Sequence, residues 1–166
     1  MRRVTCIVTV LLASLAVGAT PGPGPYDPSA DAWASLQAAG TAAATSRRRV
    51  LAVVGGNWCG WCRALDRLVS SDPRLEREIN AHFVLVHVNY SKENRNADTL
   101  ARLGHPETLG FPALVVLSPD LKVLHLQSSE PFETHDPKVP GHDPARVLAF
   151  LRAYELPSGA AALPPR

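Results

Sequence analysis

Short apolar runs alternate with stretches of helical spacing along most of the chain. The apolar runs predict four strands, at 50–54, 83–88, 113–117 and 122–126. Apolar residues at helical spacing predict five helices, at 29–47, 59–69, 73–79, 94–103 and 144–154. Because helices and strands interleave, we expect an α/β fold whose sheet is partly parallel and covered by helices on both faces.

Local signals refine this order. The run "FVLVHV" at 83–88 is apolar almost throughout, which is typical of a central strand covered on both faces. The turn sequence "SPD" separates the last two strands, so they should form a hairpin in a mixed sheet of about four strands. Asp72 and Asp143 each precede a proline, and this pair predicts a helix that begins with an aspartate N-cap.

The ends of the chain differ from its middle. Residues 1–19 have a basic start, an apolar run and then small residues, which is the order of a secretory signal peptide. The apolar run is shorter than the ~20 residues of a membrane-spanning helix, so we expect cleavage after Ala19 and a periplasmic or secreted protein. An uncleaved membrane anchor is the alternative. A linker at 20–28, one domain at 29–156 and a disordered tail at 157–166 complete the predicted organisation.

Charge gives no sign of a polyanionic partner. The whole chain has 17 Lys and Arg against 15 Asp and Glu, and removal of Arg2 and Arg3 with the signal leaves 15 against 15. Because the sequence shows no basic stripe either, we expect no binding to nucleic acid, and none to a membrane after signal cleavage. No long apolar surface helix predicts an oligomer, so we expect a monomer.

The strongest candidate for chemistry is the stretch "VGGNWCGWCRALDRLV" at 54–69. If Cys59 ends the turn after a strand and opens a helix, the positive end of the helix dipole should lower the pKa of its thiol below about 8.5. Arg63 adds positive potential. Cys62 follows one turn later, close enough to form a disulfide with Cys59. The two thiols therefore predict an attacking and a resolving cysteine for thiol–disulfide exchange.

Neighbours of the pair suggest further roles, and other uses of two cysteines stay open. Gly60 and Trp61 lie between the sulfurs; we expect Trp58 to pack over the sheet end and Trp61 to be exposed, shielding the disulfide and contacting a partner. A structural disulfide would close a very short loop and stabilise little. A zinc half-site lacks a second cysteine pair, and a copper carrier ordinarily has a different spacing. We expect no metal and no cofactor other than the Cys59–Cys62 disulfide.

The stretch "LAVVGGNWCGWCRALDRLV" resembles the thioredoxin-like superfamily, in which an apolar strand, a Trp-Cys-x-x-Cys motif and a helix with a basic first turn follow one another. A second signature, "LGFPALVVLSPDLKVL", lies about fifty residues later. The resemblance spans about 30–155 and is greater to exported domains with a Trp-Cys-x-Trp-Cys motif than to thioredoxin itself. It implies a thioredoxin fold with Pro112 as a cis-proline beside the disulfide and Phe111 before it, where backbone can pair with substrate. An ordinary trans proline is the alternative.

The chain departs from thioredoxin at one position tied to proton transfer. The family's buried aspartate before the motif is replaced by Val53, and Asp66 either takes over that role or is a solvated helix residue. We therefore interpret the protein as an exported thiol–disulfide oxidoreductase that acts on protein thiols or disulfides through Cys59 and Cys62, together with a redox partner protein. A non-catalytic adaptor or holdase, and a periplasmic metal carrier, are the alternatives.

Overall fold

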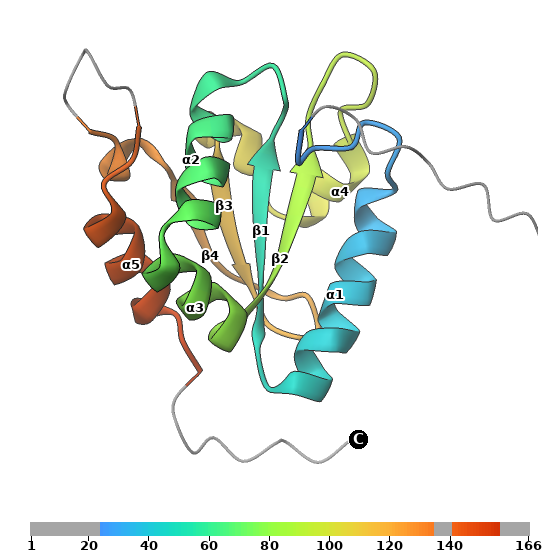
Figure 1. Ribbon diagram of the computed structural model, residues 1–166. Helices are drawn as coiled ribbons and strands as arrows, with labels where there is room; N and C mark the ends of the chain where they lie inside the picture. The colour runs from blue at the N-terminus through green and yellow to red at the C-terminus, as the bar shows by residue number, and fades with distance from the viewer. Residues whose placement is uncertain (1–23, 135–140, 157–166) are drawn as a thin grey trace, which may run out of the picture.

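The computed structural model describes residues 24–134 and 141–156, so the predicted signal peptide and tail lie outside the described residues (Figure 1). The secondary-structure elements are α1 Ala32–Ser46, β1 Arg49–Gly55, α2 Gly60–Ser71, α3 Pro73–His82, β2 Phe83–Asn89, α4 Ala97–Arg102, η1 Pro106–Leu109, β3 Ala113–Leu117, β4 Val123–Ser128, η2 Glu130–Phe132 and α5 Pro144–Ala153, with η denoting 3-10 helices. This order matches the predicted one, apart from the two 3-10 helices.

The four strands form one mixed sheet in the order β2-β1-β3-β4. β1 pairs in parallel with β2 and antiparallel with β3, and β3 and β4 form the predicted hairpin. The prediction of a central strand at 83–88 is wrong, because β2 lies at the edge of the sheet. Its apolar character has another cause: Val84 and Val86 pack toward α1, whereas Leu85 packs toward the opposite layer.

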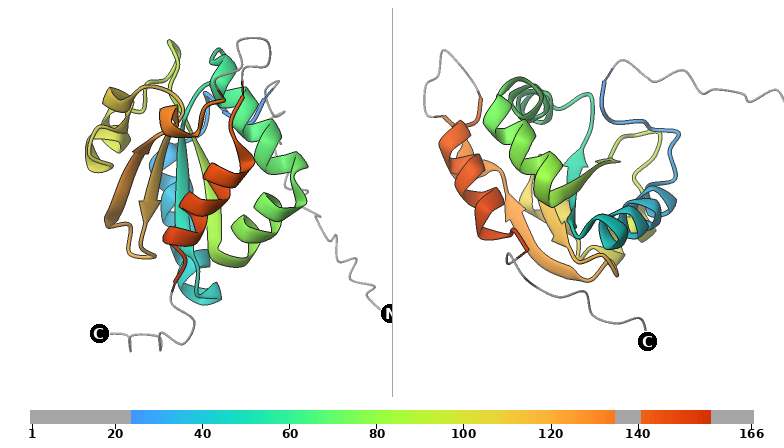
Figure 2. Two further views of the ribbon diagram at one scale, coloured as in Figure 1. Left: turned by 90° about the vertical axis from the view of Figure 1, so that its left-hand side faces the viewer. Right: turned by 60° about the horizontal axis from the view of Figure 1, so that its bottom comes forward.

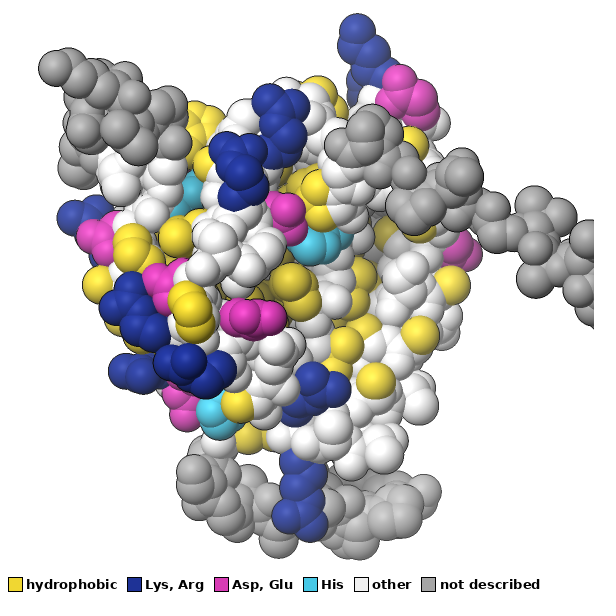
Figure 3. Space-filling model, in the orientation of Figure 1, with side chains coloured by type: hydrophobic (Ala, Val, Ile, Leu, Met, Phe, Trp, Pro, Cys, Tyr) yellow, Lys and Arg dark blue, Asp and Glu magenta, His cyan; other side chains and the backbone are white. Residues whose placement is uncertain are grey.

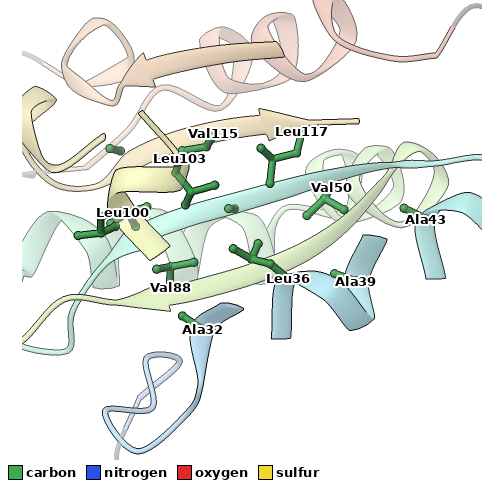
Figure 4. Packing of buried hydrophobic residues seen from close by; sticks show 13 residues of the cluster. Ala32, Leu36, Ala39, Ala43, Val50, Val88, Leu100, Leu103, Val115 and Leu117 are labelled. Atoms are coloured by element: carbon green, nitrogen blue, oxygen red, sulfur yellow. The ribbon is translucent and has the colours of Figure 1, made fainter. Parts of the chain in front are cut away.

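Two cores flank the sheet, and β1 contributes to both. Val50, Ala52 and Val54 point toward α1 and α4, while the alternate residues Leu51 and Val53 point toward α2, α3 and α5. In Figure 2 the sheet lies between these two groups of helices. Figure 4 shows the α1-side core, in which residues of α1 and α4 meet the strands. Both faces are thus covered, as the sequence predicts.

Aspartates begin three of the helices. Asp72 and Asp143 cap α3 and α5 as predicted, and each accepts a hydrogen bond from a backbone N–H of the first turn. Hydrogen bonds from Arg74 lower the pKa of Asp72 to about 2. Asp31 caps α1 in the same way, so this helix begins at Ala32 and not at the predicted position 29.

The linker predicted for 20–28 does not hold at Tyr26, which is fully buried. The backbone N–H of Tyr26 donates to the Asn57 side chain, and the Asn57 amide donates to the Tyr26 carbonyl. These bonds tie the segment before α1 to the loop between β1 and α2. Tyr26 therefore belongs to the folded domain.

The surface carries charges of both signs. In Figure 3 Lys and Arg side chains are interspersed with Asp and Glu side chains over α2, α3 and α5. Among the described residues, no helix combines the length and the apolar character needed to cross a bilayer.

Candidate redox site

Cys59 and Cys62 form a disulfide at the N-terminal end of α2. Cys59 is the capping residue, in extended conformation, and its Sγ accepts the backbone N–H of Cys62 at 3.1 Å. The two Cα atoms lie 5.2 Å apart. Because the first-turn N–H groups of a helix are unpaired and carry partial positive charge, an anionic sulfur at position 59 is stabilised there. The position suits a thiolate once the disulfide is reduced.

The loop before β3 faces this disulfide. The peptide bond between Phe111 and Pro112 is cis, and the Phe111 carbonyl oxygen lies 3.7 Å from the Cys59 Sγ. Pro112 is buried, whereas Phe111 is half-buried. The backbone of Phe111 and the outer sulfur of the pair are therefore neighbours, although 52 residues separate them in sequence.

The two tryptophans of the motif lie differently from the prediction. Trp58 is exposed over 56% of its surface, because its indole N–H donates to the Tyr90 carbonyl at 2.7 Å and turns the ring outward, edge-on to Phe111. Trp61 is half-buried, since its ring packs edge-on against the buried His142. The expectation of an exposed Trp61 and a packed Trp58 is thus wrong, and Trp58 is the aromatic surface beside the disulfide.

Gly60 and Arg63 complete the predicted set. Gly60 is exposed, and a Cβ added there would meet nothing within 4 Å. Arg63 is exposed, and its guanidinium donates to the Asn57 carbonyl. This bond keeps a positive charge on the loop that leads into Cys59. The structure therefore gathers the predicted site residues around the start of α2 and the loop before β3.

A known family matches the part of the chain from α1 to the end of β3. Residues 31–119 match the model of a family described as Thioredoxin-like. The chain belongs to this family.

Solved structures resemble the chain, and the first one below has the same fold. A disulphide isomerase from Xylella fastidiosa Temecula1 is 30% identical, with a TM-score of 0.66 over 78% of this chain and 95% of that one. A thioredoxin from Thermus thermophilus is 22% identical, with a TM-score of 0.47 over 77% of this chain and 84% of that one. An oxidoreductase named DsbH is 16% identical, with a TM-score of 0.45 over 87% and 92%. No curated protein sequence matches the chain.

The thioredoxin-like fold with a disulfide-capable cysteine pair supports a thiol–disulfide oxidoreductase. The structural match between this chain and the disulphide isomerase covers 95% of the length of the isomerase. The pair also has the geometry for exchange, because one sulfur caps the helix and the other lies one turn behind it.

Sequence reasoning missed residues that lie behind the disulfide in this thioredoxin-like protein. The Nε2 atom of His87, on β2, lies 3.2 Å from an oxygen of the Asp66 carboxylate. Burial lowers the pKa of His87, and the Asp66 carboxylate opposes this shift. Asp66 is thus no freely solvated helix residue. Tyr26 packs edge-on against His87 at 5.0 Å. Asp66 was already a candidate from the sequence, and the histidine within the apolar run at 83–88 was the one further local signal for this cluster.

The described residues contain one group that could hold a metal ion, formed by Glu78, His82 and Glu155. It lies on α3 and just after α5, away from the cysteines. The Arg152 guanidinium already donates to Glu78 at 3.3 Å, and it supplies the positive charge that a cation would bring. The neighbouring Glu78 carboxylate raises the pKa of Glu155. We assign no metal to these residues.

His142 predicts a pH dependence of stability. Burial lowers the pKa of His142 to about 4, whereas the unfolded chain binds this proton at its ordinary pKa of about 6.5. Between these values the unfolded state holds more protons, so the free energy of unfolding falls as the pH falls. We expect the melting temperature to drop by roughly 5 °C more from pH 7 to pH 5 in the wild type than in His142→Phe.

Thermal unfolding followed by circular dichroism at both pH values measures this difference. The exposed His105 offers a matched control, because His105→Asn removes a histidine at a positive φ that asparagine tolerates. This control should retain the wild-type pH dependence. Equal slopes for wild type and His142→Phe would contradict the assignment.

Proposed function

We propose that this protein is an exported thiol–disulfide oxidoreductase that exchanges disulfides with protein substrates through Cys59 and Cys62. The observation that carries the proposal is the disulfide at the start of α2, with Cys59 as the capping residue. A thiolate at position 59 is favoured by the helix end and keeps 6% of its residue surface exposed, whereas Cys62 is fully buried behind it.

Reduction of a substrate follows from this arrangement in two exchanges. The Cys59 thiolate attacks one sulfur of the substrate disulfide, and the other substrate sulfur leaves with the bonding electron pair as a thiolate. Cys62 loses its proton and attacks the Cys59 Sγ, which releases the second substrate thiolate and forms the Cys59–Cys62 disulfide. The substrate gains two electrons. A partner protein with a dithiol then reduces the disulfide, and substrate oxidation is the same sequence in reverse.

The neighbours of Cys59 fit an extended protein segment. The backbone at Phe111 and Pro112 lies beside the outer sulfur and can pair with a substrate strand through sheet-like hydrogen bonds. The exposed Trp58 ring, supported by Phe111, offers an apolar contact on the same side. The substrate groups therefore include backbone and apolar side chains next to the reacting cysteine.

Export is the part of the proposal that rests on the sequence of residues 1–19. Two thiols that must cycle between oxidised and reduced forms suit an oxidising compartment with a dedicated reductant. N-terminal sequencing of the protein recovered from a periplasmic or secreted fraction should find Thr20 first. A chain that begins at Met1 and is found in the membrane fraction would contradict cleavage and would favour the alternative of an uncleaved membrane anchor.

Trapping of a mixed disulfide tests the exchange itself. In Cys62→Ser, Cys59 can attack a disulfide but nothing resolves the product, so reduced Cys62→Ser mixed with insulin should gain the mass of one insulin molecule, whose two chains remain joined by their second interchain disulfide. Dithiothreitol should release it. Cys59→Ser is the matched control, because Cys62, the thiol that remains after signal cleavage, is fully buried, and it should trap nothing. Absence of an adduct in Cys62→Ser, together with no insulin reduction by the wild type, would favour the adaptor.

A further inference from the structure

The Tyr26 hydroxyl is a buried polar group that finds no partner in the part of the chain that the structure describes. Tyr26 is fully buried, and its hydroxyl oxygen has no hydrogen-bond partner among the described residues. Burial of an unpaired hydroxyl costs free energy, and native proteins keep few such groups. Two hydrogen bonds with Asn57 fix the backbone of Tyr26 in place. The position of the unpaired hydroxyl therefore calls for a functional explanation.

This hydroxyl lies beside the resolving cysteine. If Gly55 carried a Cβ, that atom would lie 2.6 Å from the Cys62 Sγ and 3.0 Å from the Tyr26 hydroxyl oxygen. Both atoms thus occupy the space that the missing side chain leaves at the end of β1. Tyr26, Cys59 and Cys62 form one buried cluster.

We propose that the Tyr26 hydroxyl donates a hydrogen bond to the Cys62 sulfur when the Cys59–Cys62 disulfide opens. In the oxidised protein Cys62 is bonded to Cys59 and carries no charge. When a substrate thiolate attacks the Cys59 Sγ, the bond between the cysteines breaks, and Cys62 takes the electron pair and leaves as a thiolate. A buried anion needs a hydrogen-bond donor, and the Tyr26 hydroxyl lies beside the Cys62 Sγ. This role rests on the proposed function.

The charged groups around Tyr26 make such a donor necessary. Asp66 follows Cys62 by four residues on the same face of α2 and places a carboxylate nearby. His87 faces the Tyr26 ring from β2, and its Nε2 atom lies 3.2 Å from the Asp66 carboxylate. Burial, and to a lesser extent the Asp66 charge, raise the pKa of Tyr26. Tyr26 therefore keeps its proton and remains a donor beside a second anion.

Tyr26 is thus a positioning residue whose effect depends on the redox state. It stabilises the form in which the Cys59–Cys62 disulfide is broken, and it does not stabilise the disulfide form. Loss of the hydroxyl should make the disulfide harder to reduce and should raise the pKa of the Cys62 thiol. A purely structural tyrosine would change neither property.

Tyr26→Phe separates these effects, because it removes the hydroxyl and keeps the ring. We expect the equilibrium constant for reduction by glutathione to fall about tenfold, which is a reduction potential lower by about 30 mV. In a Cys59→Ser background, Tyr26→Phe should raise the Cys62 thiol pKa, measured by thiolate absorbance against pH. The oxidised protein should be as stable as the wild type or more so, since an unpaired polar group is lost.

Tyr154→Phe is the matched control, because Tyr154 stacks on His125 at the other end of the domain, and it should leave potential and pKa unchanged. An unchanged potential in Tyr26→Phe would overturn the inference. If that variant does not fold, a structure of the reduced wild type decides: a Tyr26 oxygen within about 3.5 Å of the Cys62 Sγ supports the bond, and a longer separation overturns it. Loss of all exchange with glutathione in the wild type would instead refute the proposed function.

Discussion

Cys59→Ser is expected to abolish insulin reduction, with turnover lower by about a thousandfold or more. The reason is chemical, since only a sulfur at position 59 combines the helix end with access to a substrate disulfide. A serine hydroxyl cannot form the mixed disulfide. The buried Cys62 cannot replace it without moving the start of α2. Dithiothreitol-driven insulin precipitation, corrected for the reaction without protein, measures the loss.

Cys62→Ser should lose turnover as well but should retain the first exchange as a single burst. Retention of a tenth or more of the wild-type rate in Cys59→Ser would show that another group attacks the substrate. The nucleophile would then have to be sought outside the motif.

The order of elements was predictable because each one depends mainly on its own residues. The apolar runs of β1 and β3 and the aspartate caps of α3 and α5 are local signals, and they led to nearly correct bounds. α4 is shorter than predicted at its start. The Asn94 amide donates to the Pro28 carbonyl, 66 residues away, and holds this segment as a loop. A hydrogen bond between residues so far apart cannot be predicted from the local sequence pattern.

In the candidate site, too, the features that depend on neighbouring residues were predictable and those that depend on distant residues were not. Cys59 and Cys62 are three residues apart, so their spacing on a helix start could be inferred from sequence alone. The orientations of Trp58 and Trp61 depend on Tyr90 and His142, which lie far along the chain. The role of Tyr26 was hidden for a further reason. Its neighbours are proline and glycine, which predict a linker, whereas its contacts with Asn57 span 31 residues.

Leu36→Ala is expected to lower the free energy of unfolding by about 2–5 kcal/mol. Leu36 is fully buried in the α1-side core, between the helix and the strands (Figure 4). Truncation removes buried methyl groups and leaves a cavity. The sheet cannot move in to close it, because its opposite face is packed against the core formed with α2, α3 and α5. Since a domain of this size has a stability of about 5–15 kcal/mol, urea unfolding should detect the loss clearly.

Leu109→Ala removes the same atoms from a leucine that is 39% exposed on η1, and it should change stability by no more than about 0.5 kcal/mol. Equal effects of the two changes would contradict the assignment of Leu36 to a packed core. The buried cluster of Tyr26, Cys59 and Cys62 shares no fully buried residue with the α1-side core, and only the half-buried Phe111 packs against both. The folded fraction of Leu36→Ala should therefore keep the wild-type reduction potential, and any loss of turnover should follow the loss of folded protein.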